Sequence, residues 1–369
     1  MKKILFITNI PSPYRVDFYN ALGKYCDVTV VFEAKTAGTE GLRFNWNLDE
    51  IRNFHPVFLS EGDIQGRKLN WRIFRYLKPG QYDEIVTTNY SYLTEMAAFW
   101  YLKLFRIPYC LEIDGGKIRQ ERRLKKWYKT FLISGAKAYF SPSKVMDQYL
   151  IHYGADSRRL HRYPFTSIAE ADVLPRVLTA QEKQAYRERI GCGAGRVALG
   201  VGQFIHRKGW DVLLEAAAQL PEVQFLIVGG TVTEEYTRLC EKWQLSNVRF
   251  EGFQGDRELQ EYYRAADLFV FPTREDIWGL VINEAVAAGL PVVTTENCGA
   301  GLELVENGEN GFLVPAEDAQ ALADKMKQIL SQDDLREQMA AKSLEKSRSY
   351  TIERMAQAHA RIFQELEDR

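Results

Sequence analysis

The chain has 369 residues, which exceeds the usual size of a single domain and favours two. Hydrophobic residues make up 46% and charged residues 26%, an ordinary composition for a globular protein. The formal net charge of −1 excludes a general attraction to nucleic acid, so any electrostatic preference must come from local patches.

The cysteines and the apolar runs indicate the compartment. Five cysteines are scattered without a C-x-x-C pair, which is typical of reduced thiols and not of a disulfide or zinc framework. No run approaches 18 apolar residues, so we expect no membrane-spanning helix. The sequence therefore predicts a cytoplasmic protein.

The first half of the chain alternates short apolar runs with helical patterns. The predicted strands are Lys3–Thr8, Asp27–Phe32, Glu84–Thr88, Tyr109–Ile113 and Ala138–Ser141. The predicted helices lie near Arg15–Leu22, Trp71–Leu77, Thr94–Phe105, Glu121–Ser134 and Ser143–Tyr153. This alternation predicts an α/β unit with a mainly parallel sheet and helices on both faces.

The second half starts the same alternation again. Its predicted strands are Arg196–Gly202, Gln224–Gly229, Val248–Phe253, Leu268–Pro272 and Pro291–Thr294. Its predicted helices lie near Trp210–Leu220, Thr233–Trp243, Asp256–Ala266, Gly279–Ala288 and Ala316–Leu330. We therefore expect two doubly wound domains with a cleft between them, and ligands at the carboxyl ends of the strands.

The domain boundary falls in a stretch of scattered charge, proline and glycine at 167–195. We place the first domain at 1–170 and the second at 171–350. The polar, helical end of the chain, 351–369, is predicted to pack back on the first domain.

The segment REDIWGLVINEAVAAGLPVV at 274–293 carries two acids around a helix start. Gly279 marks the start, and a helix N-terminus suits a phosphate because its amide groups are unpaired. Glu284 lies roughly 7 Å further along the helix, at about 1.5 Å per residue. An extended nucleotide-sugar could meet Asp276 with its sugar and Glu284 with its ribose. The alternative is that Asp276 is an N-cap and Glu284 a solvated residue.

Two further loops of the second half suit phosphate. In VGQFIHRKGWD at 201–211, Gly202 lets the backbone come close, and Arg207 and Lys208 neutralise charge. In TENCGAGLELVENGENGF at 295–312, the amides near Gly299 and Gly301 could hold a second phosphate. The alternative is ordinary strand-to-helix loops with solvated cations.

The loop NIPSPYR at 9–15 follows the first strand of the chain. Two prolines stiffen it, and Asn9, Ser12 and Arg15 can face the cleft from the first domain. The alternative is a stiff connection that begins the next helix.

These segments resemble the retaining glycosyltransferases of family 4. REDIWGLVINEAVAAGLPVV resembles their E-x7-E signature, VGQFIHRKGWDVLLEA their phosphate-binding G-R-x4-K-G segment, and GFLVPAEDAQALADKM the block that follows. The resemblance covers the second half well and the first half more loosely. It implies the GT-B fold, with two Rossmann-like doubly wound domains facing across a cleft that holds a nucleotide-sugar.

The chain departs from the family pattern at three positions. Asp276 replaces the usual first Glu, and Gln203 replaces the usual phosphate-binding Arg, with Lys208 at the Lys position. Many members have an acceptor-side His where this chain has LEIDGG, so Asp114 or Glu112 would do comparable work.

The resemblance implies a retaining hexosyltransferase that uses a UDP-sugar in surface polysaccharide or glycolipid synthesis. The implied catalytic residues are Asp276, Lys208 and Asp114, and the implied donor site is Gly202, Gln203, Arg207, Lys208, Gly279, Leu280 and Glu284. The implied acceptor side is Asn9, Ser12, Arg15, Glu112 and Asp114. We expect no metal or other cofactor, because cations and helix amides would stabilise the leaving diphosphate and no Asp-x-Asp pair occurs. The alternatives are an epimerase of the same fold and a non-catalytic glycan-binding partner.

Two basic segments of the first half could contact a membrane surface. KIRQERRLKKWYKT at 117–130 has seven cations against one acid, and GRKLNWRIFRYLK at 66–78 has five cations and no acid. Basic amphipathic helices can lie on anionic membranes, so contact with the inner face of a membrane or with a lipid-linked acceptor is one interpretation. Solvated helix faces over a core are the other. No nucleic-acid reading motif accompanies the segments.

Overall fold

The structure is a computed structural model that describes residues 1–36, 50–64 and 66–367. The chain divides into two compact units: Met1–Ser167 with Thr351–Arg369 form unit 1, and Ile168–Tyr350 form unit 2. The first division falls at 167/168, where the sequence analysis places it at 170/171. Residues 368–369 of the predicted terminal helix lie outside the described residues.

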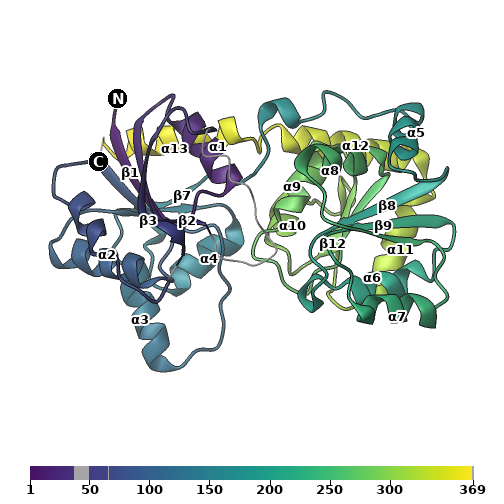
Figure 1. The fold of residues 1–369 in the computed structure, drawn as a ribbon, viewed down its shortest axis with the longest axis horizontal. Helices are drawn as coiled ribbons and strands as arrows, with labels where there is room; N and C mark the ends of the chain where they lie inside the picture. The colour runs from purple at the N-terminus through teal and green to yellow at the C-terminus, as the bar shows by residue number, and fades with distance from the viewer. Residues whose placement is uncertain (37–49, 65, 368–369) are drawn as a thin grey trace. The chain divides into compact units, whose positions relative to one another are not determined.

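Unit 1 is built on a parallel sheet in the order β3-β2-β1-β4-β5-β6-β7 (Figure 1). β1 lies inside the sheet, β2 and β3 extend the sheet on one side of it, and β4 to β7 extend it on the other. The strands are β1 Lys3–Thr8, β2 Asp27–Thr36, β3 His55–Asp63, β4 Glu84–Thr87, β5 Cys110–Glu112, β6 Ala138–Ser141 and β7 Leu160–Arg162. The order reverses between β1 and β4, which makes this point a ligand site by the general rule for such sheets.

Helices cover both faces of the sheet of unit 1. Successive residues of a strand point to opposite faces, so Phe6 contacts Phe363 of α13 while Leu5 and Ile7 belong to the core on the other face. The helices are α1 Pro13–Leu22, α2 Leu93–Leu104, α3 Arg123–Ile133, α4 Lys144–His152 and α13 Ile352–Glu365, with the 3-10 helix η2 at Trp71–Tyr76. Helix α13 packs against α1 (Figure 1).

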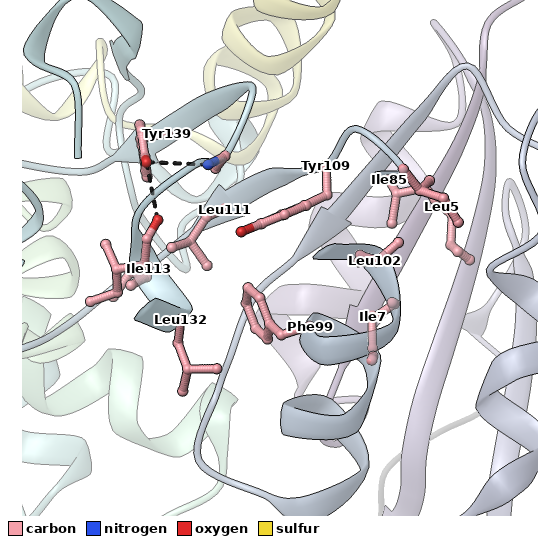
Figure 2. Close-up of a cluster of buried hydrophobic side chains, with 14 of the residues drawn as sticks. Leu5, Ile7, Ile85, Phe99, Leu102, Tyr109, Leu111, Ile113, Leu132 and Tyr139 are labelled. Carbon is pink, nitrogen blue, oxygen red and sulfur yellow. Dashed lines mark hydrogen bonds between the residues drawn. The ribbon is translucent and has the colours of Figure 1, made fainter. Parts of the chain in front are cut away.

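The core on that other face joins the sheet to α2, α3 and η2. Figure 2 shows Phe99 and Leu102 of α2 beside Ile7, Ile85 and Tyr109. At its edge, the Tyr139 hydroxyl donates to the Ile133 carbonyl at 3.0 Å and accepts from the Ala136 amide at 3.3 Å. Each fully buried side chain of this kind contributes about 2 kcal/mol, so the core holds the strand ends that carry the loops of unit 1.

Unit 2 repeats the plan with a parallel sheet in the order β10-β9-β8-β11-β12-β13. Its order reverses between β8 and β11, as it does between β1 and β4 in unit 1. The strands are β8 Arg196–Val201, β9 Val223–Val228, β10 Val248–Glu251, β11 Leu268–Phe271, β12 Val292–Thr295 and β13 Gly311–Val314.

The helices of unit 2 form two layers, with α5, α8, α9 and α12 on one face of the sheet and α6, α7 and α11 on the other (Figure 1). Their bounds are α5 Ala180–Arg189, α6 Trp210–Ala217, α7 Glu234–Lys242, α8 Asp256–Ala265, α9 Leu280–Ala287, α10 Gly299–Leu304, α11 Ala319–Leu330 and α12 Asp333–Ser347. The prediction of two doubly wound α/β domains is confirmed.

Three strands of the structure are missing from the sequence prediction. β3 reads HPVFLSEGD, and its proline and polar end break the apolar run that marks a buried strand. β3 lies at the edge of its sheet, where such residues are tolerated. β7 and β13 also lie at the edges of their sheets, where the strands are only partly buried and the pattern of a central strand is weak.

No helix within residues 1–36, 50–64 and 66–367 is both long enough and apolar enough to cross a membrane.

Candidate functional site

The loops after β8 and β11 lie next to each other, where the strand order of unit 2 reverses. The Lys208 ammonium lies 2.5 Å from an Asp276 carboxylate oxygen, and the Arg207 guanidinium lies 3.2 Å from the same oxygen. The side chains of Lys208 and Asp276 are each 12% exposed, while that of Arg207 is 44% exposed. Three predicted residues therefore meet in one group that carries one positive charge in excess.

The backbone holds the two loops in this arrangement. The Arg207 carbonyl accepts from the Arg274 amide at 2.9 Å and from the Thr273 hydroxyl at 3.0 Å. Gly209 adopts φ of +71°, and a Cβ added there would lie 2.1 Å from the Pro272 carbonyl oxygen. Only glycine can occupy this position without displacing the loop that leads to Asp276.

Helix α9 begins at Gly279 with an open N-terminus. Gly279 is the N-cap in the left-handed conformation, with φ of +95°, and no side chain from the described part of the chain caps the helix. The alternative interpretation of Asp276 as the N-cap is wrong, because its carboxylate binds Lys208 and Arg207. The first amides of α9, beginning with Leu280, are thus available to an anion near the two cations.

Gly202 follows β8 with φ of +151°, where a side chain would be strained. A Cβ added at Gly229 would lie 1.8 Å from the Gly202 carbonyl oxygen, so the loops after β8 and β9 approach each other closely. Gln203 is exposed, and its backbone carbonyl accepts from the Trp210 indole at 2.9 Å. The amide side chain that replaces the usual family Arg therefore extends from a loop fixed through its backbone.

Glu284 lies in the second turn of α9 and is partly buried. The Tyr263 hydroxyl of α8 donates to one of its carboxylate oxygens at 2.7 Å. Burial raises the pKa of Glu284 above its usual value, although the bond from Tyr263 opposes this. Sequence reasoning missed Tyr263, whose signal is the tyrosine pair in LQEYYRAAD.

The expectation of a second phosphate site at the start of α10 is wrong. The Gly299 amide donates to the Asp276 carbonyl at 3.1 Å, and the Ala300 amide donates to the Trp278 carbonyl at 2.8 Å. These amides tie the loop of Asp276 to α10, so they are already used within the fold.

Unit 1 has a pocket of about 310 Å³ where its own strand order reverses. The loops after β1, β4 and β5 form it, and it brings together four residues predicted for the acceptor side: Asn9, Ser12, Arg15 and Asp114. The Arg15 guanidinium donates to Asp114 at 2.8 Å. Sequence reasoning missed the wall after β4, whose signal is the polar run TTNYSY, and which consists of Thr88, Asn89, Tyr90 and Ser91.

The expectation that Glu112 faces an acceptor is wrong, because its side chain is fully buried and does not line this pocket. Its carboxylate lies 3.9 Å from Arg15 and 3.5 Å from His359 of α13, and it accepts from the Tyr163 hydroxyl at 3.3 Å. Of the two acids in LEIDGG, Asp114 is the one at the pocket.

The comparison with protein families identifies unit 2. The family model described as glycosyl transferases group 1 matches residues 183–346. Unit 2 belongs to the group 1 glycosyl transferases. Lys208, Asp276 and Glu284 all lie inside the matched range, so the residues that carry the sequence resemblance lie in the glycosyl transferase domain.

Curated relatives match about half of the chain. The lipopolysaccharide core biosynthesis glycosyltransferase LpsE of Rhizobium meliloti is 34% identical over 151 residues, which cover 40% of this chain and 44% of LpsE. A D-inositol 3-phosphate glycosyltransferase of Corynebacterium urealyticum is 34% identical over 202 residues, which cover 51% of this chain and 47% of that protein. The chain spans about half the length of the curated relatives it matches.

A solved structure extends the likeness to the whole chain. Anabaena HepE in complex with UDP gives a TM-score of 0.79 at 18% identity, with coverage of 98% of this chain and 100% of that one. At this identity the likeness shows the fold alone. The chain therefore has the GT-B fold, with two Rossmann-like domains, as the sequence resemblance implies.

Within the described ranges, no group of three or more His, Cys, Asp and Glu side chains is placed to hold a metal ion.

Proposed function

We propose that the chain is a glycosyltransferase that moves a hexosyl unit from a nucleotide-sugar to a hydroxyl of a glycan or lipid-linked acceptor. One observation carries the proposal. In a group 1 glycosyl transferase domain, Lys208, Arg207 and the open N-terminus of α9 surround a single carboxylate, that of Asp276. Such a site attracts a diphosphate, because cations and helix amides act together on the same anion.

The proposed donor is a UDP-sugar. Anabaena HepE, which shares the fold, has been solved with UDP and with UDP-glucose. In this chain the diphosphate would lie at Lys208, Arg207 and the amide of Leu280, near Gly202 and Gln203. The ribose diol would donate to Glu284, whose orientation Tyr263 fixes.

In the proposed reaction, the bond between the anomeric carbon and the diphosphate oxygen breaks, and a bond from the acceptor oxygen forms on the same face of the sugar. The departing phosphate accepts the proton of the acceptor hydroxyl, so configuration is retained. Lys208 and Arg207 stabilise the negative charge on the leaving group as it develops. Asp276 orients the donor sugar, and Asp114 binds the acceptor. In this proposal Lys208 and Arg207 stabilise the leaving diphosphate without the help of a metal ion, so full loss of activity in EDTA would contradict it.

The proposed acceptor site is the pocket of unit 1. Among the described residues, its lining is rich in amide and hydroxyl groups, and the one cation in it, Arg15, is already paired with Asp114. Such a lining suits a neutral polyhydroxyl compound better than an anion. The name of LpsE refers to lipopolysaccharide core synthesis, which supports a role in surface polysaccharide or glycolipid assembly.

We further propose contact with an anionic membrane through α3. Leu124 and Trp127 are 76% and 59% exposed, and they alternate along the helix with the exposed cations Arg123 and Lys126. On η2, Trp71 is 71% exposed. Apolar side chains among cations suit the boundary between headgroups and acyl chains. Vesicles with and without anionic lipid test this in a pelleting assay, and equal, negligible binding to both would contradict it.

A panel of nucleotide-sugars scored by thermal shift tests the proposed donor. A ligand that binds only the folded state must raise the melting temperature, by an amount that grows with its affinity. We expect one UDP-sugar to stabilise the chain and to be hydrolysed slowly without acceptor. Conversion of the sugar into its epimer would indicate an epimerase. Binding without hydrolysis or transfer would favour a non-catalytic partner, a role for which Gln203 at the usual Arg position gives some support.

A further inference from the structure

A cluster of four ionisable groups extends from the lining of the unit 1 pocket into the core behind it. Arg15 belongs to α1, Glu112 to β5, Asp114 to the loop after β5, and His359 to α13. Arg15 lies between two acids, 2.8 Å from Asp114 and 3.9 Å from Glu112. Glu112 in turn lies between Arg15 and His359, whose Nε2 is 3.5 Å from its Oε2. The cluster thus joins the last helix of the chain to the pocket.

The contacts of His359 decide where its protons are. Its Nδ1 lies 2.9 Å from the Met355 carbonyl oxygen, which can only accept, so Nδ1 carries a proton. His359 and Glu112 are both fully buried, and neither Nε2 nor Oε2 has a hydrogen bond to another described group. Without a second proton, two lone pairs would face each other at 3.5 Å away from water. A proton is therefore held between His359 and Glu112.

With that proton on His359, the cluster contains two cations and two anions and is neutral overall. Burial opposes ionisation of Glu112, but His359, Arg15 and Tyr163 together hold its pKa below the usual value. The Tyr163 hydroxyl donates to the other Glu112 oxygen at 3.3 Å, and burial raises the pKa of Tyr163. The hydroxyls of Tyr14 and Tyr19 on α1 also lie close enough to affect Arg15.

Aromatic rings fix the orientation of the imidazole. It stacks on Phe140 with centroids 5.1 Å apart and planes 20° apart. Phe18 and Tyr163 meet it edge-on at 4.7 and 4.5 Å. The ring therefore cannot turn its Nε2 away from Glu112 without disturbing three neighbours.

We propose that His359 is a positioning residue that sets the direction of Arg15, and that it does so by sharing Glu112 with it. While His359 is protonated, Glu112 has a second cation and Arg15 remains free to bind Asp114 at the pocket. If His359 were lost, the buried Glu112 would have Arg15 as its sole cation and would draw it away from Asp114. The consequence for acceptor binding rests on the proposed function, whereas the direction of Arg15 does not.

The first test reads the proton directly. The chain has five histidines, so nitrogen-15-labelled histidine gives a spectrum that variants can assign. We expect Nε2 as well as Nδ1 of His359 to carry a proton in the unchanged chain, and Nε2 to lose its proton in Glu112→Gln, which removes the facing carboxylate. A neutral His359 in the unchanged chain would overturn the proposal, even if no variant folds.

The second test reads Arg15 in crystal structures of His359→Phe and of the double variant His359→Phe with Glu112→Gln. Phenylalanine keeps the contacts with the aromatic rings and removes the proton. In the single variant we expect Arg15 to approach Glu112 to about 3 Å and to leave Asp114. In the double variant no buried anion remains to attract it, so Arg15 should return to Asp114. An unmoved Arg15 in the single variant would overturn the proposal.

His161→Phe is the matched control. Its ring also lies near Phe140, at 6.4 Å, but it pairs with Glu365 and not with Glu112. We expect no movement of Arg15 in this variant. UDP affinity, measured on every sample, reports on unit 2 and so separates the two proposals. If no sample binds UDP, the proposed function is contradicted, whereas the result on the direction of Arg15 still stands.

Discussion

The sheets of the two units reverse their strand order in the same way, between β1 and β4 and between β8 and β11, but the charges at these two places differ. In unit 1, the two acids Glu112 and Asp114 lie beside Arg15 and the proposed imidazolium of His359, so the charges balance. In unit 2, two cations, Lys208 and Arg207, face the single acid Asp276 beside an open helix N-terminus. The fold provides the place for a ligand in both units, and the charge of a few loop residues decides which ligand suits it.

The same contrast holds in the interiors. In unit 2, the buried Asp267 is matched by Arg187 at 2.6 Å and Lys183 at 3.7 Å. In unit 1, the buried Glu33 and Glu95 affect each other, and neither has an ion-pair partner among the described residues. Among the described residues, the buried acid of unit 2 is therefore ion-paired with two cations, whereas these two buried acids of unit 1 are ion-paired with none.

The largest expected effect concerns the buried Glu95 of unit 1, which has no ion-pair partner among the described residues. Burial, with Glu33 close by, raises the pKa of Glu95 to about 8. The folded state therefore binds more protons than the unfolded state from about pH 4.5 to pH 8, and stability falls as pH rises through that window. Glu95→Gln should remove this loss, on the order of 4 kcal/mol, so it should raise the urea midpoint at pH 9 far more than at pH 5.

The exposed Glu61→Gln in the same unit is the control and should leave the pH dependence unchanged. If Glu95→Gln shifts the midpoint equally at both pH values, ionisation of the buried Glu95 does not limit the stability of unit 1.

Removing a cation from unit 2 should weaken anion binding. Lys208→Ala loses a charge-assisted contact with the diphosphate, and such contacts are worth about 3 kcal/mol at most. We expect UDP to bind about 100-fold more weakly by titration calorimetry. Lys242→Ala, which removes an exposed cation of α7, should bind UDP normally. Equal UDP affinity in the two variants would contradict the claim that Lys208 binds the diphosphate in unit 2.

Removing the acid of the same group should separate binding from transfer. Asp276→Asn leaves Lys208 and Arg207 without their carboxylate partner, so UDP should bind at least as well as before. Because the donor sugar loses its orienting group, kcat should fall about 30-fold, or about 2 kcal/mol. Asp211→Asn breaks an ion pair with Arg274 of similar length, 2.6 Å, and is the control. Loss of UDP affinity in Asp276→Asn would mean that Asp276 holds the site together instead.

A smaller effect is expected at the ribose. Glu284→Gln should raise donor KM about 10-fold, or about 1.4 kcal/mol, with little change in kcat. Since burial raises the pKa of Glu284, donor KM of the unchanged chain should rise as pH falls toward that pKa, and the variant should lose this dependence. Glu303→Gln is the matched control, because Glu303 also accepts a hydrogen bond from a tyrosine hydroxyl, that of Tyr350, at 3.1 Å. Its donor KM should not change. An unchanged KM in Glu284→Gln would contradict the ribose assignment.

The sequence predicts the fold class and most strands, because β1 and β2 have apolar runs long enough to recognise. It also points to Lys208 and Asp276 through their loops. Their contact is not predictable, since they are 68 positions apart and meet only because β8 and β11 are neighbours. The sequence analysis did not predict a role for His359, because the terminal segment 351–369 is largely polar in sequence. What could have pointed to it is its helical spacing from the apolar residues Met355, Ala356, Ala360 and Phe363, which are buried with it on one face of α13.

The central claim is that the charge group of unit 2 receives the diphosphate of the donor, and a crystal structure with UDP tests it most directly. We expect phosphate oxygens within about 3 Å of the Lys208 ammonium and of the first amides of α9, with the ribose at Glu284. Density for UDP in the Asn9–Asp114 pocket of unit 1, with Lys208 still bound only to Asp276, would contradict the account.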